Sequence, residues 1–194
     1  MTDRADLDIA LIDRYLSGDI DAFNELMAAH EDRVFAVCLR MLRNREAALD
    51  ATQDTFLTVF RKADRFKAQA AFSTWLYRVA VNTCYDHLRR QKRKQADSLP
   101  DSHDAPDPST DDLLRAVDVR SDIEEALLAL SPDFRAAVVL VDLQGMSLEQ
   151  ASDTLEVPTG TIKSRLFRAR KQLSQSLGNL RPPNEHQTGD TGET

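Results

Sequence analysis

The sequence lacks most features that mark enzymes, metal proteins, secreted proteins and membrane proteins. It has two cysteines in 194 residues, Cys38 and Cys84, and both fall in helical patterns, which favours buried free thiols over a disulfide or a metal site. The histidines are scattered without metal-ligand spacing. Because no Gly-rich phosphate loop or nucleophile motif occurs either, we expect no catalysis, no cofactor and no small-molecule substrate.

Long apolar runs are also missing. The run at residues 136–141 has six residues and no run is longer, whereas roughly 18 are needed to cross a bilayer. The first residues are acidic and lack the apolar stretch of a signal peptide. These absences predict a cytoplasmic protein. A hydrophobic content of 42% is sufficient for one or two domains with a buried core.

The most informative segment that is present is residues 146–173, whose pattern is typical of a helix-turn-helix. Ser147 and Gln150 can form a capping box at the start of a first helix. Residues 157–160 interrupt that helix, and Thr159 is placed to cap a second one. The second helix has a narrow apolar stripe at helical spacing, formed by Ile162, Leu166, Ala169 and Leu173.

The remaining surface of this second helix is suited to DNA. Residues 161–173 contain five cations and no acid, and Arg or Lys on a helix in the major groove can pair with base edges. The alternative is a surface helix whose cations extend over the apolar stripe. The capping box, the turn and an aromatic on the polar face favour DNA contact. The predicted contact residues are Lys163, Ser164, Arg165, Phe167, Arg168, Arg170 and Lys171.

The charge distribution limits how the chain can use this helix. Its formal net charge is −7, whereas an autonomous DNA-binding domain is usually basic, because neutralising phosphates supplies much of its affinity. The cations gather in residues 161–173 and 89–94, and acids dominate elsewhere. This imbalance predicts a protein that does not hold DNA unaided.

The first 94 residues have helical spacing and no strand-like alternation, with breaks at Gly18 and residues 43–45. In the helix expected from Asp50 to about Lys62, the side formed by Phe56, Val59 and Phe60 should face inward. Another face combines acids, an amide and an apolar side chain. It is either a partner-binding surface or a plainly solvated one, and its residues are Asp50, Gln53, Asp54 and Leu57.

The helix expected from Ser73 to about Arg93 carries a second set of candidate DNA contacts. Aromatic rings and guanidinium groups can stack on unpaired bases, and an amide can bond a base edge. A core position for Trp75 is the alternative. The preceding residues 66–72 form an expected loop that could hold a flipped base. The predicted contacts in this region are Phe66, Lys67, Phe72, Trp75, Arg78, Asn82, Arg89 and Arg90.

The composition divides the chain into four parts. Residues 95–112 contain six Asp, three Pro and neither Lys nor Arg, which predicts an extended linker. This linker is either a solvated tether or an acidic strand that occupies a basic channel built for nucleic acid. We therefore predict an all-α protein of two helical domains, the second a helix-turn-helix. The predicted parts are a first domain (1–94), a flexible acidic linker (95–115), a second domain (116–178) and a disordered tail (179–194).

Four motifs in this order resemble the extracytoplasmic-function (ECF) sigma factors of bacterial RNA polymerase. They lie at residues 50–56, 72–82, 130–132 and 158–170, and the resemblance covers roughly residues 8–178. It implies a promoter-melting domain followed by a domain that contacts the upstream promoter element. The expected partners are core RNA polymerase, promoter DNA and an anti-sigma factor that covers the docking surfaces.

The resemblance also implies a role for each candidate surface. Asp50, Gln53, Asp54 and Leu57 would dock on the clamp helices of the largest polymerase subunit. Residues 66–72 would capture a base flipped from the minus-ten element, with Asn82 contacting bases nearby. Lys163, Ser164, Phe167, Arg168 and Arg170 would contact the minus-thirty-five element, and the acidic linker would run toward the active-site cleft.

The main alternative is a stand-alone helix-turn-helix regulator with an N-terminal sensing or dimerisation domain. It accounts for residues 146–173 but not for the outer face of the 73–93 helix or the acidic linker. Such a regulator should bind its operator without polymerase and dimerise to match two half-sites.

Overall fold

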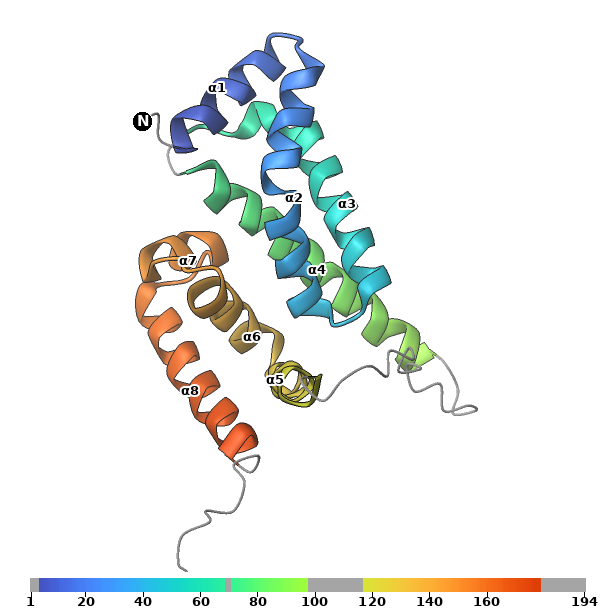
Figure 1. Ribbon diagram of the computed structural model, residues 1–194, viewed down its shortest axis with the longest axis vertical. Coiled ribbons are helices and arrows are strands. Elements are labelled where there is room, and N and C mark those ends of the chain that lie inside the picture. The colour runs from blue at the N-terminus through green and yellow to red at the C-terminus, as the bar shows by residue number, and fades with distance from the viewer. Residues whose placement is uncertain (1–3, 69–70, 98–116, 179–194) are drawn as a thin grey trace, which may run out of the picture.

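The computed structural model describes residues 4–68, 71–97 and 117–178, and all regular structure in these residues is helical. The all-α prediction is therefore confirmed. The predicted tail (179–194) and most of the predicted linker lie outside the described residues. Residues 95–97, which we assigned to the linker, instead continue a helix of the first domain. Two helical bundles result, one from each end of the described chain (Figure 1).

The first bundle holds its helices around a continuous apolar core. Three long helices pack on one another, and a shorter N-terminal helix lies across them (Figure 1). Val34, Val37 and Leu76 at their contacts have no exposed surface. The elements are α1 (Arg4–Leu16), α2 (Ile20–Leu42), α3 (Arg45–Lys62), the 3-10 turn η1 (Ala63–Arg65) and α4 (Phe72–Asp97).

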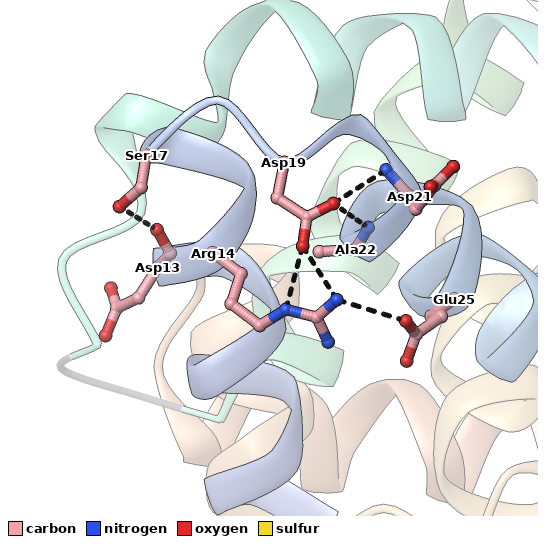
Figure 2. A network of polar contacts seen from close by, with 7 residues as sticks. All are labelled: Asp13, Arg14, Ser17, Asp19, Asp21, Ala22 and Glu25. Atoms are coloured by element: carbon pink, nitrogen blue, oxygen red, sulfur yellow. Dashed lines mark hydrogen bonds and ion pairs between the residues drawn. The ribbon is translucent and has the colours of Figure 1, made fainter.

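Local chemistry ends and begins these helices at the predicted breaks. Gly18 has a φ of +103°, a left-handed conformation that favours glycine, and it separates α1 from α2. Asp19 caps α2 by accepting hydrogen bonds from the backbone N–H groups of Asp21 and Ala22. Arg14 in α1 holds the cap through two hydrogen bonds of 3.0 and 2.7 Å to Asp19 (Figure 2). The first interhelical corner is thus fixed by polar contacts.

The second bundle contains the predicted helix-turn-helix. The Ser147–Gln150 capping box forms, with both reciprocal hydrogen bonds present. We predicted Thr159 as the cap of the second helix, but it is the first residue of that helix. The Pro158 carbonyl accepts hydrogen bonds from the backbone N–H groups of Thr161 and Ile162 instead. The elements are α5 (Val117–Ala129), α6 (Pro132–Val138), the π-helical turn η2 (Val139–Leu143), α7 (Leu148–Leu155) and α8 (Thr159–Gly178).

The two bundles contact each other along α4 and α7 and share a continuous buried core. At one end of this contact, the Arg135 guanidinium donates to the carbonyl of Met41 at the end of α2. It also donates to three carbonyls at the end of α5. Helix C-termini carry partial negative charge, so they stabilise a buried cation at this position. The domains of the described structure are therefore held together by specific polar bonds as well as by apolar packing.

Candidate polymerase and nucleic-acid interfaces

A groove of about 520 Å³ lies between α2 and α3. Its wall includes Leu49, Leu57 and Phe60, which are 50%, 43% and 44% exposed although they are large apolar side chains. An exposed apolar surface of this kind, rimmed by polar groups, is typical of a protein-binding site. The full lining is Phe23, Met27, Glu31, Leu49, Asp50, Thr52, Gln53, Phe56, Leu57 and Phe60.

Three of the four predicted docking residues line this groove, and the fourth does not. Asp50, Gln53 and Leu57 are in its wall. The Asp54 carboxylate instead lies 3.1 Å from His87 Nε2, so it joins α3 to α4. Phe60 also departs from our prediction of an inward position, because its ring meets Phe23 only at the rim of the core and leaves 44% of its surface in the groove.

Sequence reasoning missed the α2 side of the groove and one exposed apolar residue of α3. Leu49 precedes Leu57 by eight residues, which is close to two helical turns, and this spacing could have placed both on one face. Our sequence analysis gave no binding role to Phe23 and Met27 on α2. Only the packing of α2 on α3 shows that their edges contribute to an open groove.

Three aromatic side chains gather where α4 begins. Phe66 and Phe72 meet at right angles with ring centroids 5.6 Å apart, and Trp75 lies within 6 Å of both. Phe66 and Trp75 are half-buried. Phe72 is only 1% exposed, so the predicted direct contact between Phe72 and a base is wrong for this arrangement. Buried below the other two rings, Phe72 can support them. We call Phe66, Phe72 and Trp75 the aromatic cluster.

The other predicted contacts of this region fall into two groups. Lys67, Asn82 and Arg90 are exposed, as is Arg89, which pairs with Asp86 at 3.1 Å. Arg78, in contrast, faces the second domain. Its Nη2 donates to the Asp153 carbonyl at 2.6 Å, and its Nη1 lies 3.1 Å from the Glu156 carboxylate. The expected continuous outer face of α4 is therefore interrupted at Arg78.

The polar face of α8 presents an aromatic and several cations to solvent. Phe167 is 72% exposed, the largest fraction among the large apolar residues that the structure describes. Lys163, Arg168 and Lys171 surround it and are exposed, as is Ser164, whose hydroxyl donates to the Thr161 carbonyl. The stripe formed by Ile162, Leu166 and Ala169 is buried on the other side of the helix, as predicted.

The two remaining arginines of α8 are held by acids of the same domain. Arg165 donates to Asp133 at 2.7 Å, which joins α8 to α6. Arg170 forms a two-point contact with Asp142 in η2, and the hydrogen bonds to Asp142 raise the pKa of Arg170. These pairs fix the rotation of α8 against its neighbours. Among the described residues, Lys163, Arg168 and Lys171 are the cations of the predicted set that form no ion pair. Hydrogen bonds from the backbone and Ser147, and to a smaller extent the charge of Lys163, lower the pKa of Glu149 at the start of α7.

The described residues contain no cluster of three or more metal-ligating side chains and no helix long and apolar enough to cross a membrane. Cys38 and Cys84, 46 positions apart in sequence, are buried free thiols in contact between α2 and α4. The hydrogen bond that Cys84 donates to Cys38 and burial raise the pKa of the Cys84 thiol. The thiol pair therefore belongs to the core of the first domain.

Comparison with known families decides between the two alternatives left open by the sequence. Residues 26–94 match the Sigma-70 region 2 family, and residues 120–173 match the Sigma-70, region 4 family. Relatives that are 37–38% identical over 80–89% of the chain are named ECF RNA polymerase sigma factors. The chain belongs to the ECF sigma factors. It is thus a transcription initiation factor that directs RNA polymerase to promoters, not an enzyme and not a stand-alone regulator.

Individual relatives agree with this assignment. The ECF RNA polymerase sigma factor SigM of Mycobacterium tuberculosis is 37% identical over 173 residues, which cover 89% of this chain and 86% of SigM. SigE of Mycolicibacterium smegmatis is 38% identical over 159 residues, which cover 80% of this chain but 62% of SigE. The chain therefore spans less than two thirds of SigE.

Two solved structures have the same fold. CnrH in complex with the cytosolic domain of CnrY has a TM-score of 0.69 at 24% identity and covers 90% of this chain and 99% of CnrH. The sigma factor RpoE of Bartonella quintana, solved with the anti-sigma factor NepR, has a TM-score of 0.65 at 29% identity. That alignment covers 80% of this chain and 96% of RpoE.

Proposed function

We propose that this sigma factor docks on core RNA polymerase through the groove between α2 and α3. The observation that carries this proposal is the chemistry of the groove wall. Leu49, Leu57 and Phe60 offer apolar area for a protein partner, whereas Glu31 and Asp50 give the wall acidic groups that would repel DNA. A polymerase helix with apolar and basic side chains fits both features.

The exposed face of α8 is the proposed contact with the upstream promoter element. Lys163, Arg168 and Lys171 can approach phosphates or guanine edges, and Phe167 can meet a thymine methyl group. Arg165 and Arg170 orient the helix through their acidic partners and lie at its flanks. Their guanidinium groups can turn to the DNA backbone only by leaving those partners.

The region around the start of α4 is the proposed site of strand opening. Phe66 and Trp75 offer partly exposed ring surface on which an unpaired base can stack, and Asn82 lies exposed two turns further along α4. Lys67, Arg89 and Arg90 supply positive charge beside them. Separated bases of the downstream element would be held here after the duplex opens.

We further propose that an anti-sigma factor regulates the protein, as NepR accompanies the Bartonella quintana relative. Such a factor would cover the apolar groove, because core polymerase could then no longer reach it. The proposed partners are thus core RNA polymerase, promoter DNA and an anti-sigma factor. Core RNA polymerase and promoter DNA are both in the bacterial cytoplasm, so the cytoplasm is the proposed location of this protein.

Single-round transcription with purified core RNA polymerase tests the proposal. We expect start-site-specific transcripts from genomic promoter fragments only when both the chain and core enzyme are present. Leu57→Asp places a charge in the groove wall and should abolish the transcripts by preventing association. Leu128→Asp, the same change at an equally exposed leucine of α5 outside the groove, is the matched control. Normal transcription by a folded Leu57→Asp variant would exclude the groove as the docking surface.

A further inference from the structure

A buried ionisable pair lies beneath the aromatic cluster. His30 Nε2 on α2 is 3.0 and 2.9 Å from the two carboxylate oxygens of Asp8 on α1. Each residue is only 2% exposed. Arg4 also approaches Asp8, at 3.5 Å, but its side chain is half exposed. The imidazole is therefore the main buried partner of the carboxylate.

The imidazole ring of His30 contacts the aromatic cluster directly. Its centroid lies 5.3 Å from that of Phe72, with the rings at 66°, an edge-to-face arrangement. Phe72 in turn packs against Phe66 and Trp75. An unbroken series of contacts thus runs from α1 through α2 to the half-buried rings at the start of α4.

The free-energy cost of burying this pair indicates that it does more than hold α1 against α2. Burying a carboxylate and an imidazole carries a desolvation penalty, and His30 Nδ1 is buried without a hydrogen-bond partner. Two aliphatic side chains could hold α1 on α2 without that penalty. Aliphatic side chains would not give Phe72 a neighbouring ring in a fixed orientation. The His30 imidazole does, because its Nε2 is bound to both oxygens of Asp8. What the pair adds is therefore a fixed ring surface under Phe72.

We infer that Asp8 and His30 are positioning residues for strand opening. They fix Phe72, and Phe72 sets the orientation of Phe66 and Trp75 toward unpaired bases. This inference rests on the proposed function of the aromatic cluster. It assigns α1, which otherwise lies outside the proposed DNA and polymerase contacts, a role in the opening step rather than in polymerase binding.

The test uses the full chain with core polymerase and the double variant Asp8→Leu/His30→Leu. The double change avoids leaving either ionisable group buried alone, so the domain should fold. We expect unchanged association with core enzyme. The double variant should open duplex promoter DNA about three- to tenfold more slowly, an effect equivalent to the loss of one aromatic pair. The permanganate reactivity of unpaired thymines measures this opening. Asp8→Asn keeps an acceptor oxygen for His30 and should recover most of the rate.

A template with a pre-opened mismatched bubble separates positioning from general stability. The double variant should transcribe this template at the wild-type rate, because the opening step is bypassed. Val37→Ala, a core truncation on α2 away from the cluster, is the control for reduced stability and should open duplex DNA normally. Equal losses on both templates, or a wild-type opening rate on duplex DNA, would overturn the inference.

Phe66→Ala, measured in parallel, tests the proposed function itself. If Phe66→Ala opens DNA slowly and the double variant opens it normally, the positioning role fails while the aromatic cluster remains the opening site. If Phe66→Ala opens DNA at the wild-type rate, the proposed role of the cluster fails, and the inference fails with it.

Discussion

Arg78 of α4 and Glu156, the C-cap of α7, form an ion pair of 3.1 Å across the contact between the two domains. Glu156 follows the first helix of the helix-turn-helix, and its backbone is left-handed with a φ of +53°. A residue predicted to contact promoter DNA is thus bound to the domain that should contact the upstream element. The Nη1 and Nη2 atoms of Arg78 are engaged in this contact, so they can bond DNA freely only after the contact opens.

Reversing the charge at Glu156 should loosen the domain contact. Glu156→Lys places a cation beside Arg78, and we expect a larger distance between fluorophores attached to the two domains of the free chain. Stability should change by no more than about 1 kcal/mol, because the Glu156 side chain is 66% exposed. Glu125→Lys, an equal charge change at an exposed site on α5, should leave the distance unchanged. An unaltered distance in Glu156→Lys would mean that the pair does not hold the domains.

Substitutions on α8 should separate contact residues from orienting residues. Arg168→Ala should weaken promoter binding of the polymerase complex by about 1–3 kcal/mol if the side chain contacts a base. If it contacts a phosphate, the loss should be similar for all sequences, and the salt dependence should decrease. Lys163→Ala should behave in the same way. Wild-type transcription by folded Arg168→Ala from a promoter that requires its upstream element would contradict this assignment.

The sequence placed Asp50 and Asp54 on one face of α3, but substitutions at the two positions should affect polymerase association differently. Asp50 lies in the groove wall, so Asp50→Lys should slow association with core polymerase by roughly tenfold at low salt, where electrostatic attraction is least screened. Asp54 pairs with His87, so Asp54→Asn should mainly affect the contact between α3 and α4. Association rates measured at low and high salt would distinguish them, and equal rates for both variants would remove the distinction.

Features that depend on neighbouring residues were predicted from the sequence, whereas features that depend on residues far apart in the chain were not. The capping box at Ser147 and the break at Gly18 involve neighbouring residues, so local patterns were sufficient. Arg165 is paired with Asp133, 32 positions away, and Arg78 contacts residues 75 positions or more away. Helical spacing puts Arg165 at the edge of the polar face of α8 and Arg78 on the polar face of α4, but it does not show which arginine is bound by a residue of another helix. Only the packing of the helices separates cations held within the protein from cations open to a partner.

The same reasoning explains the difference at Phe72. Its position next to a predicted loop suggested an exposed ring, because loops are usually on the surface. In the structure, His30 from α2 covers it on one side, and Phe66 and Trp75 cover it on another. No periodicity in residues 66–75 contains that information, since the covering histidine is 42 positions away in sequence.

The corner between α1 and α2 should weaken in acid. The hydrogen bond from Arg14 lowers the pKa of Asp19, as do the N–H groups that Asp19 caps. A carboxyl group with a lowered pKa in the folded state stabilises the protein above its unfolded pKa of about 3.9, and this contribution is lost as the pH falls toward the folded pKa. Asp19→Asn should therefore be less stable than wild type at pH 7, and the difference should shrink in acid.

Urea unfolding across this pH range measures the effect. Asp13→Asn, one turn before Ser17 on α1, is the control, because the Asp13 carboxylate takes no part in the network of Figure 2. A difference between Asp19→Asn and wild type that stays constant from pH 7 into acid would show that the Asp19 carboxylate does not contribute through its charge.

The free chain should bind promoter DNA weakly or not at all near physiological salt. Its net charge of −7 repels DNA over most of its surface, and its exposed cations are densest on α8 and at the end of α4. Arg78 is also occupied by the second domain. Core polymerase would cover the acidic groove and add its own DNA contacts. Fluorescence anisotropy with labelled promoter DNA, with and without core enzyme, tests this expectation.

Glu156→Lys should increase the affinity of the free chain for promoter DNA, because it removes one acid and releases Arg78. The matched charge change Glu125→Lys should have the smaller effect. Tight, sequence-specific binding by the free wild-type chain would contradict the prediction.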